Sequence, residues 1–204
     1  MLLKLPQSIE QISNNSLYGN LQDNWSGAVT VLIVEDSILF IRRSESMPTH
    51  KGQIGFMGGH KHKGENSPIE TAKREFEEES GLGAENLNVL GLLDPVITSR
   101  GKIIIPVIAR GDFSKEHILS NATSNGEWDN LIFAPKKYLS SQNIWSKGQY
   151  IVEKQYSVYF APLALNICHY LYPETNPYLL WGASAKMILN FFKYDVSCDK
   201  NLKN

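Results

Sequence analysis

Short apolar runs separated by polar turns predict a series of strands in the first two thirds of the chain. Two such runs, at 28–34 and 37–42, flank the polar pair Glu35 and Asp36, which predicts a β-hairpin. Further strands are expected at 53–56, 88–93, 103–109 and 128–133, and a short helix at 135–139. The strand at 53–56 leads into a glycine pair, Gly58 and Gly59.

A longer helix is expected from residue 68 to residue 80, because start and stop residues bound a helical apolar pattern. Ser67 fits the N-cap, Pro68 the first helical position and Glu70 the third, which together form a capping box. Gly81 suits the left-handed conformation that ends a helix. The apolar positions recur at i, i+3 and i+7 and are Ile69, Ala72 and Phe76.

The remaining pattern predicts one domain of the α+β class. Strands and helices mix without regular βα alternation, which indicates a mixed β-sheet packed between helices. The domain is expected over 26–194, with an amphipathic closing helix at 184–192. Residues 1–25 form a prefix expected to hold a helix and a polar loop, and 195–204 form a tail. Residues 140–181 are aromatic and interrupted by proline, and are expected to lie partly as a loop over the site.

Composition narrows the functional classes only slightly. The chain has 204 residues, 42% apolar residues and a net charge of −1, so no basic excess points to nucleic acid. Cys168 and Cys198 are too few for a disulfide framework, which favours reduced thiols in a cytoplasmic protein. No run approaches about 20 apolar residues, so no membrane span is expected. The first residues form too short an apolar run for a signal peptide.

Three carboxylates on the predicted helix point to a metal site. Glu75, Glu78 and Glu79 stand at i, i+3 and i+4, and therefore lie on one helical face. Like charges in this arrangement repel one another unless a cation binds them. Mg²⁺ or Mn²⁺ suits a site made only of oxygen atoms. The alternative is a solvated acidic face that Lys73 and Arg74 partly neutralise.

The segment around this helix, GGHKHKGENSPIETAKREFEEESGL over residues 58–82, resembles the Nudix box, G-x5-E-x7-R-E-U-x-E-E-x-G-U, where U is a bulky aliphatic residue. The second half fits from Arg74 to Leu82, except that Phe76 fills the first U position. Eight residues rather than seven separate Glu65 from Arg74. That expansion resembles the coenzyme A diphosphatase branch of the Nudix hydrolases.

Segments outside the box extend the resemblance to about residues 26–193. Arg43-Ser44 and the run at 50–59 are similar to the segment that precedes the box in this branch. Pro48 and Met57 depart from the branch, which usually has arginine and proline there. Later similarities are at 90–95 with Thr98 and Pro106, at 126–128 with 134–135, and at 181–185.

The resemblance implies an α/β/α sandwich and an enzyme that hydrolyses a diphosphate linkage in a nucleoside diphosphate derivative with Mg²⁺ or Mn²⁺. The branch implies coenzyme A or an acyl-CoA as the small-molecule substrate, giving 3′,5′-ADP and phosphopantetheine. Two alternatives stay open: a Nudix pyrophosphatase for another substrate, and a non-catalytic nucleotide-binding module. Dimers are frequent in this superfamily, so a homodimer is an assembly to test.

The expected site residues divide into three groups. The metal ligands are expected to be Glu75, Glu78, Glu79 and the Gly58 carbonyl, with Glu65 in an outer site. Arg74 is expected to orient the carboxylates, and Glu127 is the first candidate for the general base, with Glu75 as the alternative. Glu65 and Glu127 have a second interpretation as solvated loop residues. The expected substrate contacts are Arg43, His50 and Gly59.

Overall fold

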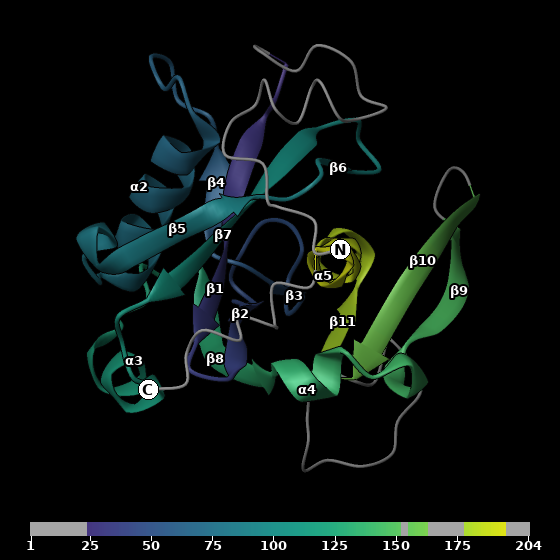
Figure 1. The fold of residues 1–204 in the computed structure, drawn as a ribbon. Helices are drawn as coiled ribbons and strands as arrows, with labels where there is room; N and C mark the ends of the chain where they lie inside the picture. The colour runs from purple at the N-terminus through teal and green to yellow at the C-terminus, as the bar shows by residue number, and fades with distance from the viewer. Residues whose placement is uncertain (1–23, 152–154, 163–177, 195–204) are drawn as a thin grey trace.

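The computed structural model describes residues 24–151, 155–162 and 178–194, and its centre is a mixed β-sheet (Figure 1). The strands of this sheet are β1 (Gly27–Val34), β2 (Ser37–Arg43), β3 (Ile54–Gly55), β4 (Gly58–His60), β5 (Leu87–Leu92), β6 (Val96–Ile97), β7 (Ile103–Gly111) and β8 (Trp128–Pro135). The predicted hairpin at Glu35 and Asp36 is confirmed as the turn between β1 and β2.

Strand β1 is the centre of the sheet. It pairs antiparallel with β2 and β4 and parallel with β7, so the mixed sheet predicted from the sequence is confirmed. The outer strands β8 and β5 pair antiparallel with β2 and β7, respectively. The glycine pair therefore belongs to a short strand, β4, that runs beside the middle of the fold.

Two helices cover opposite faces of the sheet, which confirms the sandwich. Side chains along a strand alternate between its faces. On β1, Val31 and Ile33 pack in the cluster that holds Phe191 of α5 (Gly182–Lys193). Leu32 and Val34 pack in the cluster that holds Phe76 of α2 (Pro68–Ser80). Figure 1 shows α2 and α5 on either side of β1, β2 and β7.

The ends of α2 follow from its sequence, with one correction. The Ser67 side chain accepts a hydrogen bond from the Ile69 amide, and Gly81 adopts φ 70° at the C-cap. The predicted capping box differs in its second bond, because the Glu70 carboxylate accepts from the Asn66 amide at 2.9 Å, where a capping box uses the N-cap amide of Ser67.

The described part of 140–181 is mostly strand, and the partial loop predicted for this segment stays a prediction, because 163–177 lie outside the described residues. The elements are the short 3₁₀ helix η2 (Gln142–Ile144) and a three-stranded antiparallel sheet of β9 (Ser146–Ile151), β10 (Gln155–Pro162) and β11 (Leu179–Trp181). Aromatic and β-branched residues in β10 favour a strand, and its proline lies at the strand end where it interrupts no interior pairing.

Three further short elements connect the strands: α3 (Lys115–Asn121), α4 (Lys136–Leu139) and the 3₁₀ helix η1 (Ala84–Asn86). Helix α4 and the closing helix α5 confirm the predictions made near those positions. The predicted prefix helix and the tail fall almost wholly outside the described residues. None of the helices in the described ranges is long and apolar enough to cross a membrane.

Strand β4 approaches β1 so closely that Gly58 has no room for a side chain. Its φ is +151°, and a Cβ atom there would lie 2.4 Å from the Ala28 carbonyl oxygen and 2.4 Å from the Val29 Cα. Both neighbours are backbone atoms, which cannot rotate away. The glycine therefore sets the position of β4 against β1, next to α2.

We expect Gly58→Ala to lower the free energy of unfolding by about 3 kcal/mol or more, because it adds both a steric overlap and an unfavourable φ. The matched control is Gly64→Ala in the following loop, where φ is +98° and no atom lies within 4 Å of the new Cβ. That control should lose only about 1 kcal/mol. Urea denaturation measures both values, and equal losses would contradict the close approach.

Candidate metal centre and active site

Helix α2 is fixed against the centre of the sheet at the level of the glycine pair. The Thr30 hydroxyl of β1 donates a buried hydrogen bond of 3.0 Å to the Ala72 carbonyl. Because Ala72 and Phe76 are buried on the same side, the helix cannot rotate about its axis without exposing apolar surface. The face that bears the carboxylates is thereby held beside β4.

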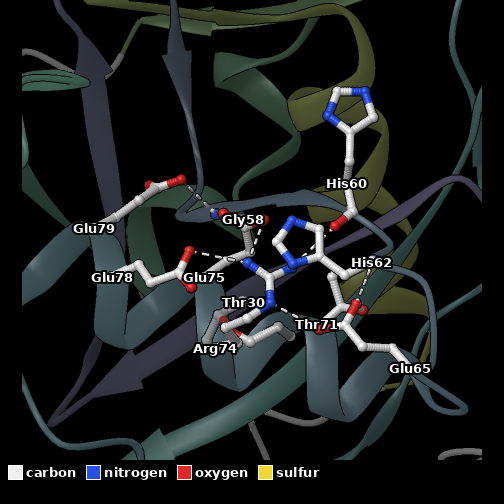
Figure 2. A network of polar contacts seen from close by, with 11 residues as sticks. Thr30, Gly58, His60, His62, Glu65, Thr71, Arg74, Glu75, Glu78 and Glu79 are labelled. Atoms are coloured by element: carbon white, nitrogen blue, oxygen red, sulfur yellow. Dashed lines mark hydrogen bonds and ion pairs between the residues drawn. The ribbon is translucent and has the colours of Figure 1, made fainter.

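Arg74 joins the acidic side chains of the box into one network (Figure 2). Its Nε donates to Glu65 Oε1 at 2.7 Å, and its Nη1 donates to Glu75 Oε1 and Glu78 Oε2, each at 2.9 Å. The remaining Nη2 donates to the His60 carbonyl at 3.0 Å. The hydrogen bond with Glu65 is the main cause that raises the pKa of Arg74. The arginine thus orients the carboxylates and ties them to β4.

Glu65 is saturated by protein donors. Its Oε2 accepts from the His62 amide at 2.7 Å and from the Thr71 hydroxyl at 2.6 Å, while Oε1 accepts from Arg74. Burial acts to raise its pKa, but the hydrogen bonds from Arg74, Thr71 and His62 outweigh burial and lower the pKa to about 2. In this structure Glu65 therefore holds Arg74 in place, and its part in an outer metal site stays a prediction.

Glu79 has the opposite environment. Its side chain is 1% exposed, its Oε1 accepts from the Gly58 amide at 3.3 Å, and its buried Oε2 has no hydrogen-bond partner among the described residues. Burial is the main cause that raises its pKa to about 8, and the charges of Glu127 and Glu75 raise it further. A buried carboxylate oxygen without a donor is costly unless another group binds it.

A divalent cation fits this orphaned oxygen, and the surrounding donors are the hard oxygen ligands that Mg²⁺ and Mn²⁺ prefer. The described part of the chain holds no ready-formed group of three metal-ligating side chains. Arg74 bridges Glu75 and Glu78 instead. For these two carboxylates to join Glu79 around one ion, they would have to turn from the guanidinium.

Glu127 lies close enough to Glu79 to influence its ionisation. Its carboxylate is 3.8 Å from Arg43 Nη2, and its side chain is 37% exposed. Arg43 acts electrostatically on Glu79 as well, and its buried Nε has no hydrogen-bond partner within the described ranges. The fold thus brings together Arg43, Glu79 and Glu127, which the sequence indicated for three different roles.

The other predicted substrate contacts are less directly connected to the carboxylates. Gly59 adjoins the Glu75 carboxylate, since a Cβ there would lie 2.4 Å from Glu75 Oε1. His50 is exposed in the turn before β3 with φ +58°, and its Nδ1 lies 3.1 Å from Gln53 Oε1. Its role toward a substrate stays a prediction.

Two hydrogen bonds of the site were not predicted from the sequence. Thr71 precedes Arg74 by three positions, so it lies one turn earlier on the same helical face, and its hydroxyl donates to Glu65. Trp128 donates from its indole Nε1 to the Glu79 carbonyl at 2.7 Å. Helical spacing could have revealed Thr71. The contact made by Trp128 depends on how β8 pairs with β2, which no local pattern indicates.

The chain belongs to the Nudix family, because a profile described as "NUDIX domain" matches residues 25–142, more than half of its length. A protein of Pectobacterium atrosepticum named "Uncharacterized Nudix hydrolase NudL" is 42% identical over 72 residues, which are 35% of this chain and 38% of that protein. A protein of the same name from Yersinia pestis is 33% identical over 109 residues, 52% of this chain and 54% of that protein. The chain thus spans about half or less of the curated relatives it matches.

Solved structures with a similar arrangement include a C. elegans Ap4A hydrolase binary complex and the E. coli ORF135 protein. The first has a TM-score of 0.45 and 18% identity, over 54% of this chain and 80% of that one. The second has a TM-score of 0.48 and 15% identity, over 85% and 91% of the two chains.

The environment of Glu79 predicts an unusual dependence of stability on pH. The unfolded chain releases this proton near pH 4.5, whereas the folded protein retains it to about pH 8. Stability should therefore fall as the pH rises through this window. We expect Glu79→Gln, in the presence of a chelator, to be more stable than the wild type at pH 9 by roughly 2 kcal/mol, and to lose this advantage at pH 4.

Denaturation curves at a series of pH values measure this difference. Glu77→Gln is the matched control, because Glu77 is an exposed residue on the same helix, and it should leave the pH dependence unchanged. A Glu79→Gln protein less stable than the wild type at pH 9 would contradict the unpaired, buried carboxylate.

Proposed function

We propose that the protein hydrolyses the diphosphate linkage of a nucleoside diphosphate derivative with Mg²⁺ or Mn²⁺, and that coenzyme A or an acyl-CoA is its substrate. The products are then 3′,5′-ADP and a phosphopantetheine. The observation that carries this proposal is the buried Glu79 carboxylate, whose Oε2 has no partner in the described part of the chain. Membership of the Nudix family and the hydrolase names of its relatives support it.

Glu75, Glu78 and Glu79 would hold the cation, together with the Gly58 carbonyl. When bound, Mg²⁺ or Mn²⁺ neutralises diphosphate oxygens and lowers the pKa of an attacking water. Arg74 fixes Glu75 and Glu78 in orientation and keeps them on the side of the helix that faces β4. Glu65 in turn fixes Arg74, as outer groups commonly do for ligating carboxylates.

Proton transfer is assigned to Glu127, with Glu75 as the alternative base. Glu127 supports this role because it is partly exposed and close to Glu79, so it can meet both solvent and the site. A carboxylate in this position would accept a proton from the attacking water. Arg43 lies beside it and offers a guanidinium to a phosphate oxygen of the substrate.

The choice of coenzyme A rests on the one-residue expansion of the box and on the segment before it. The orphaned Nε of Arg43, at the end of β2, suits an anionic ligand. Pro48 and Met57 favour a second candidate, a Nudix pyrophosphatase for another substrate. Pro48 is exposed, whereas Met57 is 3% exposed and packs in the core, so the exposed Pro48 bears more directly on substrate choice.

Phosphorus-detected product analysis tests the proposal. We expect the purified protein with Mg²⁺ or Mn²⁺ to release 3′,5′-ADP from coenzyme A in preference to cleaving ADP-ribose, a nucleotide sugar, diadenosine polyphosphates or nucleoside triphosphates. Glu78→Gln should lower kcat by at least about 100-fold, since it removes a proposed cation ligand. Glu77→Gln, the exposed neighbour on the same helix, should keep nearly full activity.

Cleavage of another member of the panel would retain the chemistry and replace coenzyme A by that substrate. If the Glu78→Gln protein is as active as the wild type, Glu78 does not belong to the proposed set of cation ligands. Nucleotide binding without turnover of any substrate would contradict the enzyme and favour a binding module.

A further inference from the structure

The turn that carries Glu127 is bonded directly to the end of the box helix. The Trp128 indole Nε1 donates to the Glu79 carbonyl at 2.7 Å, and the Thr123 amide donates to the next carbonyl, that of Ser80, at 2.8 Å. The last four carbonyls of a helix have no partner within it. Segment 123–128 therefore caps α2, and it does so at the residue that contributes the buried carboxylate.

The same turn is internally rigid. The Ser124 hydroxyl accepts from the Gly126 amide at 3.0 Å and donates to the Trp128 carbonyl at 2.7 Å. The Asn125 side chain accepts from the Glu127 amide at 3.1 Å. Side chains of this kind stabilise tight turns by bonding nearby backbone groups. Glu127 thus has little backbone freedom of its own.

A second strand holds the other side of the turn. The Ser44 amide, just after β2, donates to the Glu127 carbonyl at 2.9 Å. The pairing of β2 with β8 shifts register between Arg42 and Arg43, and Arg43 lies opposite Trp128. Such an irregularity re-aims the side chain at its position, here Arg43, whose Nη2 lies 3.8 Å from the Glu127 carboxylate.

We propose that Trp128 is a positioning residue for the reaction: its indole N–H locks the Glu127 turn to the Glu79 backbone, so that the Glu127 base is held beside the cation that Glu79 binds. This inference rests on the proposed function. The hydrogen bond makes the spacing between Glu79 and Glu127 a property of the fold rather than of two independent side chains. Without it, the turn retains its internal bonds and the bond from the Thr123 amide to the Ser80 carbonyl, but loses its link to the Glu79 carbonyl.

The test removes the indole hydrogen-bond donor of Trp128 and keeps an aromatic side chain at this position. Trp128→Phe removes the indole N–H, and Trp145→Phe is the matched control, because the Trp145 indole donates in the same way to the Leu139 carbonyl at 2.9 Å at the end of α4. We expect Trp128→Phe to lower kcat and to weaken Mn²⁺ binding, each by about tenfold, with little change in KM. The control should change neither quantity.

Coupling to Glu127 separates positioning from a general loss of stability. In a background that already carries Glu127→Gln, Trp128→Phe should have almost no further effect on kcat, because there is no base left to position. Multiplicative effects of the two substitutions would overturn the proposal. So would equal effects of Trp128→Phe and Trp145→Phe on kcat and Mn²⁺ binding.

Failure of the proposed function gives a different result. A wild-type protein that binds Mn²⁺ but cleaves none of the substrates contradicts the function alone, and the Mn²⁺ titration of the two tryptophan variants still decides the role of Trp128. If Trp128→Phe leaves the Mn²⁺ affinity unchanged, the positioning role of Trp128 is overturned. A wild type that binds no Mn²⁺ overturns both proposals.

Discussion

The burial of one carboxylate is the constraint on which the rest of the site depends. Glu79 lies on the buried side of α2, where its Oε1 has a single backbone donor and its Oε2 has none among the described residues. Three structural features hold it there: the glycine strand β4, the apolar face of α2 and the indole of Trp128. Each removes water from the carboxylate without offering it a positive charge. The fold thereby keeps an electrostatic cost that a cation would relieve.

The neighbouring glutamates differ from Glu79, because each of them has a charged hydrogen-bond partner in Arg74. Glu65 is satisfied by Arg74, Thr71 and a backbone amide, and its low pKa reflects that. Glu75 and Glu78 share one guanidinium nitrogen, a bond that they can exchange for another cation. Arg74 therefore has two sets of bonds: it anchors to Glu65 and β4, and it holds Glu75 and Glu78, the proposed ligands, on the same helix as the buried Glu79.

Local signals in the sequence predicted those parts of the fold that local interactions determine. The hairpin at Glu35 and Asp36, the caps of α2 and the mixed sheet are confirmed, as is the family. Helix α3 was missed because its seven residues bury only Ile118, which gives no periodicity to detect. The burial of Glu79 was also missed, although helical spacing places Glu79 on the side of Ala72 and Phe76 and Glu78 away from that side. The bonds from Gly58 of β4 and from Trp128 add tertiary contacts that no local pattern indicates.

Anomalous diffraction from crystals grown with Mn²⁺ tests the central claim most directly, because it locates the ion without relying on turnover. We expect an Mn²⁺ peak within about 2.5 Å of Glu79 Oε2, with Glu75 or Glu78 turned from Arg74 toward the ion. The bonds between Arg74 and Glu65 should persist in that structure. A protein saturated with Mn²⁺ elsewhere, with Glu79 Oε2 still buried and alone, would contradict the account.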